Sequence, residues 1–112
     1  MAATKSAAPA PTDVDQAVAA LATEGWTDAS PWESTPEQHY PAHKHRYEKV
    51  VVCVAGSIVF TTEGSLISLD AGERMDMEAG TVHEAVAGPG GSVCVEAKER
   101  PGRARPQQDQ PA

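Results

Sequence analysis

Residues 39–56 read HYPAHKHRYEKVVVCVAG, and in this segment three of the chain's four histidines precede its most continuous apolar run. Side chains at even separation along a β-strand face the same side of the sheet. If residues 43–54 form one strand, every second side chain from His43 to Cys53 faces one side, and the intervening ones face the other. We therefore expect a buried strand whose inward face begins with two imidazoles.

After this segment, short runs rich in Val, Ile, Leu and Thr alternate with glycine-containing turns. About six or seven short strands at such spacing are typical of a β-sandwich or barrel. The pattern therefore predicts an all-β domain, with strands expected at 43–55, 57–62, 65–69, 74–77, 81–87 and 92–97.

One helix is predicted ahead of the strands, over residues 12–25, with Thr12 as its N-cap and a glycine at its end. Residues 25–36 follow and contain Trp26 and Trp32 among Pro and Ser. We interpret this segment as an ordered loop whose aromatic side chains cover a sheet edge.

The length of 112 residues allows one domain with a single modest core. Residues 1–12 are rich in Ala and Pro, and residues 100–112 combine Pro, Gln and charge without apolar periodicity. Both ends are predicted to be disordered tails, which leaves residues 13–99 as the folded domain.

The net charge of −7 disfavours nucleic acid and anionic membranes as partners. No apolar run is long enough for a membrane span or a signal peptide, so we expect a cytoplasmic protein. Cys53 and Cys94 lie in Val-rich runs and are predicted to be buried, reduced thiols. A disulfide between them is the alternative interpretation.

The pair His43 and His45 presents two imidazoles from one strand to a single point, which suits a divalent metal ion. Histidine pairs that bind nothing are also common at protein surfaces, so the pair alone decides little. The fourth histidine, His83, follows the turn Ala79-Gly80 and lies near the start of another predicted strand.

Residues 43–56 (HKHRYEKVVVCVAG) and 72–87 (GERMDMEAGTVHEAVA) resemble the two signature motifs of the cupin superfamily, and the likeness in strand rhythm extends over residues 39–98. The chain is similar to small single-domain bacterial cupins. The resemblance implies a cupin-type β-barrel, a double-sheet jelly roll, with one short N-terminal helix. It also implies a metal site formed by His43, His45 and His83.

The chain departs from the family pattern at several positions. Lys49 stands where the family motif has its glutamate ligand, and Glu48 faces away if the strand alternates strictly. A β-bulge near Tyr47 is the alternative that would turn Glu48 inward. Glu78 replaces the proline of the second motif, and Ala87 replaces its last asparagine.

Two side chains near the predicted site have two interpretations each. Lys49 either forms an ion pair with Glu96 or, together with a metal, attracts an anionic ligand. Tyr47 either lines the pocket and donates a hydrogen bond or only fills space. His39 is expected at the pocket mouth rather than as a fourth ligand, and Cys53 is expected in the core.

The resemblance implies a metal-dependent enzyme for a small anionic organic substrate, either dioxygenase-like or an isomerase or lyase. Fe²⁺ is the favoured metal, with Zn²⁺, Ni²⁺, Mn²⁺ and Cu²⁺ as alternatives. Lys49 and Tyr47 are the predicted catalytic residues, which position or protonate the substrate. A non-catalytic binding cupin and a purely structural barrel are the alternatives. Small cupins pair through edge strands, so a homodimer is also expected.

Overall fold

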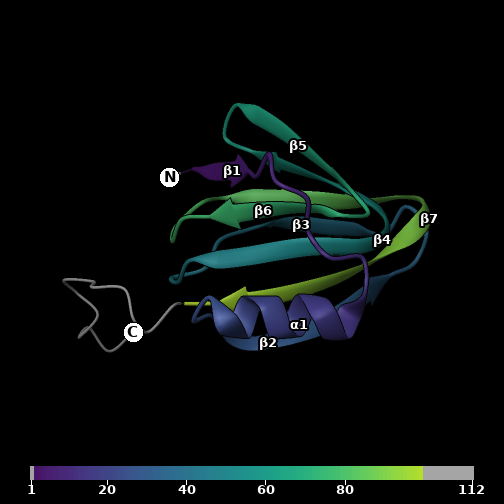
Figure 1. Cartoon of the computed structure of the whole chain (residues 1–112). Helices are drawn as coiled ribbons and strands as arrows, with labels where there is room; N and C mark the ends of the chain where they lie inside the picture. The colour runs from purple at the N-terminus through teal and green to yellow at the C-terminus, as the bar shows by residue number, and fades with distance from the viewer. Residues whose placement is uncertain (1, 100–112) are drawn as a thin grey trace.

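The computed structural model describes residues 2–99 as a folded-over antiparallel sheet with one helix on its outside (Figure 1). The elements are β1 (Ala3–Lys5), α1 (Val14–Thr23), β2 (Thr27–Ser34), β3 (His39–His43), β4 (Lys49–Thr62), β5 (Ser65–Asp70), β6 (Glu73–Met77) and β7 (His83–Lys98). The predicted all-β domain with one N-terminal helix is confirmed. Within residues 2–99, no helix has both the length and the apolar character needed to cross a lipid bilayer.

Strands β4 and β7 lie at the centre of the domain. They have 14 and 16 residues, and they pair with each other along most of their length. The first half of β4 and the second half of β7 lie inside a layer ordered β1-β6-β4-β7-β2. Their other halves lie inside a second layer, where β5 pairs with β4 and β3 pairs with β7. Both layers are therefore built on the same two strands.

The two long strands bend where their register shifts, between Cys53 and Ala55 and again between Gly56 and Ile58. Gly56 has a φ of +72°, and a Cβ placed there would collide with the carbonyl oxygen of Gly91. The prediction of two short strands in place of each of β4 and β7 is wrong. Glycine inside a strand also marks a bulge or a close backbone approach, and that is its role here.

The main core lies between the two layers and is formed by inward side chains such as Val51, Ile58, Phe60, Leu69 and Met75. A second apolar cluster lies on the opposite face of β4 and β7, under helix α1. The first half of β4 is thus buried on both faces, which explains why its sequence is continuously apolar.

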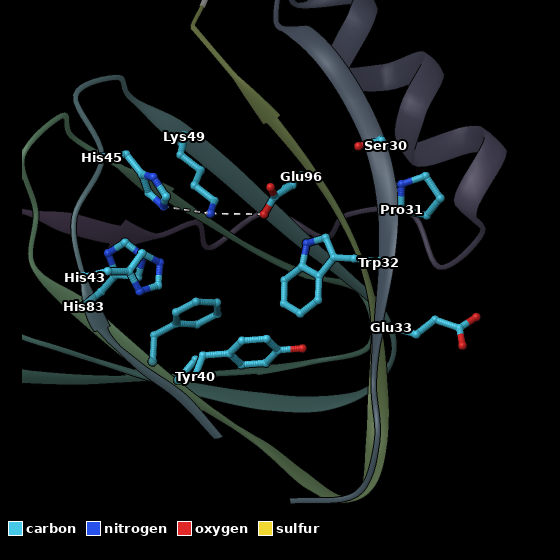
Figure 2. A pocket seen from close by; sticks show the side chains of 12 residues that line it. Ser30, Pro31, Trp32, Glu33, Tyr40, His43, His45, Lys49, His83 and Glu96 are labelled. Carbon is cyan, nitrogen blue, oxygen red and sulfur yellow. Dashed lines mark hydrogen bonds and ion pairs between the residues drawn. The ribbon is translucent and has the colours of Figure 1, made fainter. Parts of the chain in front are cut away.

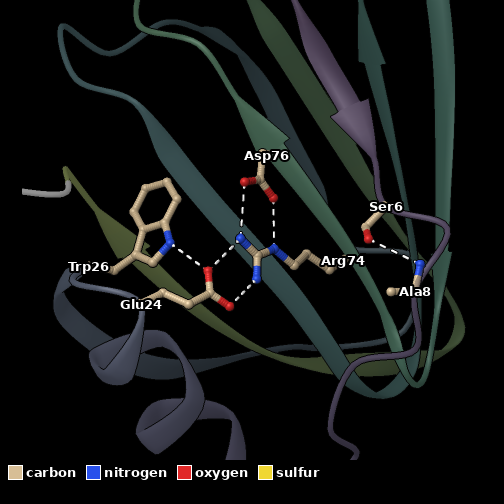
Figure 3. A network of polar contacts seen from close by, with 6 residues as sticks. All are labelled: Ser6, Ala8, Glu24, Trp26, Arg74 and Asp76. Carbon is tan, nitrogen blue, oxygen red and sulfur yellow. Dashed lines mark hydrogen bonds and ion pairs between the residues drawn. The ribbon is translucent and has the colours of Figure 1, made fainter. Parts of the chain in front are cut away.

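Helix α1 begins one residue later than predicted, because Asp13 rather than Thr12 accepts a hydrogen bond from the Gln16 backbone N–H. The end of the helix is tied to the sheet by Arg74, whose guanidinium contacts the carboxylates of Glu24 and Asp76 at 2.7 Å (Figure 3). The indole of Trp26 donates to the same Glu24 carboxylate. These contacts fix the helix over the outer face of β4.

The prediction of a disordered segment over residues 1–12 is wrong for the part that the structure describes. Residues Ala3–Lys5 form β1 and pair with the free edge of β6, and Ala10 donates its N–H to the Gly72 carbonyl. Backbone pairing with an otherwise open sheet edge is enough to order a short polar segment. The predicted tail at residues 100–112 lies outside the described residues.

The segment 25–36, predicted as a wrapping loop, instead contains strand β2. It pairs with β7, and the edge position accommodates Pro31, because the missing N–H is not needed there. Trp26 packs under the helix, while Trp32 faces the space between the layers. The two tryptophans therefore pack in different apolar clusters, on opposite faces of the sheet.

Candidate metal centre

Two histidines that are close in sequence and one that is distant meet at one end of the space between the layers (Figure 2). His43 ends β3 and is the register partner of His83, which begins β7. His45 lies in the loop 44–48, so the prediction of one strand over residues 43–54 is wrong. The loop is held by a hydrogen bond from the Gly80 N–H to the His45 carbonyl, and it brings the third imidazole back toward the other two.

One ligand atom of each of the three rings can be chosen so that all lie within 4.8 Å of one another. Two of the rings are oriented by main-chain carbonyls: His43 Nδ1 lies 2.8 Å from Pro41 O, and His83 Nδ1 lies 2.9 Å from Thr81 O. A carbonyl only accepts, so each Nδ1 donates its hydrogen and each Nε2 keeps a lone pair. Such fixed tautomers are typical of metal-binding histidines.

The third ring, His45, contacts side chains on both of its nitrogens. Its Nδ1 lies 3.1 Å from the Tyr47 hydroxyl, and its Nε2 lies 3.5 Å from Lys49 Nζ. An ammonium only donates, so Nε2 is the nitrogen with the lone pair. All three rings therefore present Nε2 as the nitrogen able to bind a cation.

Burial favours the neutral form of two of the imidazoles, His45 and His83. Burial, and after it the nearby Lys49 ammonium, together lower the pKa of His45 to about 4. Burial also lowers the pKa of His83, against the opposing effect of its hydrogen bond to Thr81. A metal ion binding near neutral pH therefore does not have to displace protons from these two rings.

Lys49 lies inside the site, between His45 and Glu96. Its Nζ is 3.1 Å from Glu96 Oε1, and its side chain is only 12% exposed. The predicted ion pair between Lys49 and Glu96 is thus confirmed. A buried ammonium at this depth needs such a partner.

The remaining predicted site residues lie outside the cavity. Tyr47 stacks on His45 with an interplanar angle of 23° and carries Lys98 Nζ over its ring. His39 faces the outer side of the sheet, 3.8 Å from Glu84, so it is neither a ligand nor a mouth residue. Among residues 2–99, the ligand cluster consists of the three histidines, and Glu48 does not join it.

The histidines open into a cavity of about 370 Å³ (Figure 2). Its apolar wall is formed by Trp32, Tyr40, Phe60 and Ala85, and its polar lining includes Lys49 and Glu96. This wall was not predicted from the sequence, because its residues come from β2, β3, β4 and β7 and meet only through strand pairing. Period-two alternation from the inward His43 would place Tyr40 on the outer face, and a register shift between the two residues is what brings both side chains to the cavity.

No protein-family model matches the chain, and no curated protein matches it at a significant level. Solved structures do resemble it. An RmlC-like cupin from Shewanella frigidimarina is 22% identical, with a TM-score of 0.60 over 76% of this chain and 71% of that one. KdgF from Halomonas sp. is 23% identical, with a TM-score of 0.56 over 64% and 67%.

A third similar structure is the DMSP lyase DddQ from Ruegeria pomeroyi, 22% identical with a TM-score of 0.58. The match covers 68% of this chain but only 40% of that protein. Together with the observed sheet topology, these likenesses show that the chain has the cupin fold.

The donor set fits a transition metal ion. Three neutral imidazoles suit zinc, copper, iron or nickel, and three protein ligands leave coordination positions open for other molecules. The cluster of His43, His45 and His83 inside a cupin fold therefore supports a metal-binding cupin.

Proposed function

We propose that the protein is a metal-dependent enzyme that acts on a small anionic organic substrate, either dioxygenase-like or an isomerase or lyase, with Fe²⁺ as the favoured metal. The observation that carries the proposal is the convergence of three imidazole lone pairs at the end of a cavity of about 370 Å³. The similar structures with the cupin fold include DMSP lyases, so this fold accommodates enzymes.

The charge of the site favours anions once a metal ion is held. Without metal, the charges of Lys49 and Glu96 compensate each other, and burial favours the neutral form of His45 and His83. A dication leaves the site positive by two charges, in surroundings where Coulombic attraction is stronger than in water. A carboxylate or enolate is the small organic group that matches such a site.

The protein's own side chains have distinct roles in this proposal. A bound metal ion supplies Lewis acidity at its open positions. Lys49 reaches the cavity and holds the anionic part of the substrate by charge. Tyr47 does not line the cavity, so we propose that it positions the His45 ring through their hydrogen bond and stacking contact.

Elemental analysis of protein purified without chelator tests the proposal. We expect about one transition metal ion per chain in the wild type and a strong loss in His83→Ala, because one of three ligands is removed. His39→Ala is the matched control: it removes an exposed histidine outside the site and leaves the metal content unchanged. Equal metal content in wild type and His83→Ala contradicts the proposed site.

A non-catalytic metal-binding cupin is the second candidate, and turnover separates it from the enzyme. Protein loaded anaerobically with Fe²⁺ is incubated with a panel of small carboxylic acids, and product formation is followed with and without dioxygen. Turnover that needs the metal and is lost in His83→Ala supports the enzyme. Metal binding without turnover of any acid in the panel favours the binding protein.

A further inference from the structure

The indole N–H of Trp32 is a buried donor for which residues 2–99 offer no hydrogen-bond partner. Buried donors in native proteins are nearly always paired. Trp26, the other tryptophan, follows this rule by donating to Glu24 at 3.2 Å. Trp32 lines the cavity, so a ligand held there can supply the missing acceptor once the indole and Glu96 move apart to admit it.

An acceptor with spare capacity lies beside this donor. Trp32 pairs with Cys94 and Ser30 pairs with Glu96 in the β2–β7 register, so Trp32 and Glu96 are diagonal neighbours. Figure 2 shows the indole nitrogen on the side of the ring that faces Glu96 and Lys49. Lys49 uses one carboxylate oxygen of Glu96, and a carboxylate can accept further hydrogen bonds.

A ligand group between Trp32 and Glu96 must accept from the indole and donate to the carboxylate. A ligand carboxylate is repelled by Glu96, and an ammonium has no lone pair for the indole N–H. A hydroxyl group accepts and donates at once. We propose that the ligand carries a hydroxyl group between Trp32 Nε1 and Glu96, while its anionic group lies at the histidines; this inference rests on the proposed function.

The wall between these two ends defines the body of the ligand. Phe60, Tyr40 and Ala85 line the cavity between the histidines and Trp32, and the Trp32 and Tyr40 rings meet edge to face at 5.5 Å. Such a wall accommodates an apolar or planar body rather than a sugar-like chain of hydroxyl groups. The ligand class is therefore a hydroxy acid with a compact apolar body.

Isothermal titration calorimetry with matched acids tests the inference. Zinc-loaded wild type is titrated with phenylacetate, 3-hydroxyphenylacetate and 4-hydroxyphenylacetate, which differ only in the presence and position of a hydroxyl group. We expect at least one hydroxylated acid to bind about five- to tenfold more tightly than phenylacetate, which corresponds to a net gain of one or two hydrogen bonds. The same titrations are made with Trp32→Phe and with Trp26→Phe.

Loss of the hydroxyl advantage in Trp32→Phe, and its retention in Trp26→Phe, supports the inference. Equal affinity of the wild type for all three acids overturns it while leaving the proposed function in place, and this comparison needs no variant. An undiminished advantage in Trp32→Phe also overturns it. Failure of folded wild type to bind zinc overturns the proposed function, and the titrations are then made on the metal-free protein, where the same hydroxyl comparison decides the inference.

Discussion

The positively charged Lys49 ammonium lies next to His45 Nε2, the nitrogen that would bind a metal ion. Its Nζ lies 3.5 Å from His45 Nε2 and 3.1 Å from Glu96 Oε1, so the ammonium is shared between a metal ligand and a carboxylate. Repulsion between an ammonium and a dication at such short range weakens metal binding. Glu96 offsets this effect because it draws Lys49 away from His45.

Zinc affinity should therefore respond in opposite directions to the two partners of this pair. We expect Lys49→Met to bind Zn²⁺ at least about fivefold more tightly and Glu96→Gln at least about fivefold more weakly. The double variant should lie closer to Lys49→Met than additive effects would place it, because part of the effect of Glu96 on the metal passes through the lysine. Competition with a fluorescent zinc chelator measures all four affinities. Independent, additive effects of the two substitutions contradict this coupling.

At the level of single residues, the resemblance to the cupin motifs implied which histidines meet. Strand alternation placed Lys49 inward, and Glu96 was its expected partner from a neighbouring strand. These predictions hold although the strand assigned to residues 43–54 is wrong, because the loop 44–48 returns His45 to the same side as His43. Trp32 was not predictable as a cavity residue. Its position depends on pairing with Cys94 more than sixty residues away, which no local pattern records.

The bend shared by β4 and β7 depends on backbone contact at Gly56. We expect Gly56→Ala to lower the free energy of unfolding by about 2–4 kcal/mol, because the new methyl group meets the Gly91 carbonyl and the φ of +72° is strained for alanine. Gly64→Ala is the matched control: its φ of +80° is similar, but nothing lies within 4 Å of the added Cβ. Its expected effect is about 1–2 kcal/mol. Urea unfolding measures the loss of unfolding free energy in each variant, and equal losses contradict a role for the contact with Gly91.

Helix α1 stabilises the domain without taking part in the site. Leu21 is 1% exposed and packs in the cluster that covers the outer face of β4 and β7. We expect Leu21→Ala to lower the free energy of unfolding by about 2–4 kcal/mol, because it leaves a cavity there. The zinc stoichiometry of the folded variant should equal that of the wild type. Thermal unfolding measures the stability, and elemental analysis measures the zinc stoichiometry. Loss of zinc from folded Leu21→Ala contradicts the prediction that the helix has no part in the site.

The all-β class was predictable from period-two patterning and turn glycines, but the lengths of β4 and β7 and the presence of β1 and β2 were not. The local sequence around Gly56 and around the glycines of residues 88–91 does not distinguish a reversal of the chain from a bend within a strand. In the hairpin at Glu63-Gly64 it reverses, as predicted, whereas in β4 and β7 the partner strand continues alongside and the pairing carries on. That difference is decided by the partner strand, which is distant in sequence.

At the scale of the whole molecule, metal binding should stabilise the fold. The three histidines come from β3, the loop before β4 and the start of β7, so one ion would link segments that separate on unfolding. We expect Zn²⁺ at about 100 times its Kd to raise the free energy of unfolding by about 2.7 kcal/mol. Chelator should reverse the increase, and His83→Ala should show little of it. Calorimetric melting curves measure the effect, and an equal increase in His83→Ala contradicts it.

Because β4 and β7 run through both layers, neither layer is a separable folding unit. If one layer unfolded, β4 and β7 would lose their hydrogen-bonded partners along about half of their length, and these same two strands form the centre of the other layer. Amide exchange in both layers should thus be governed by the same global opening event. Fragment complementation would have to divide the chain at a hairpin such as Glu63-Gly64, since a cut at the bend of β4 leaves only half of that strand on each piece.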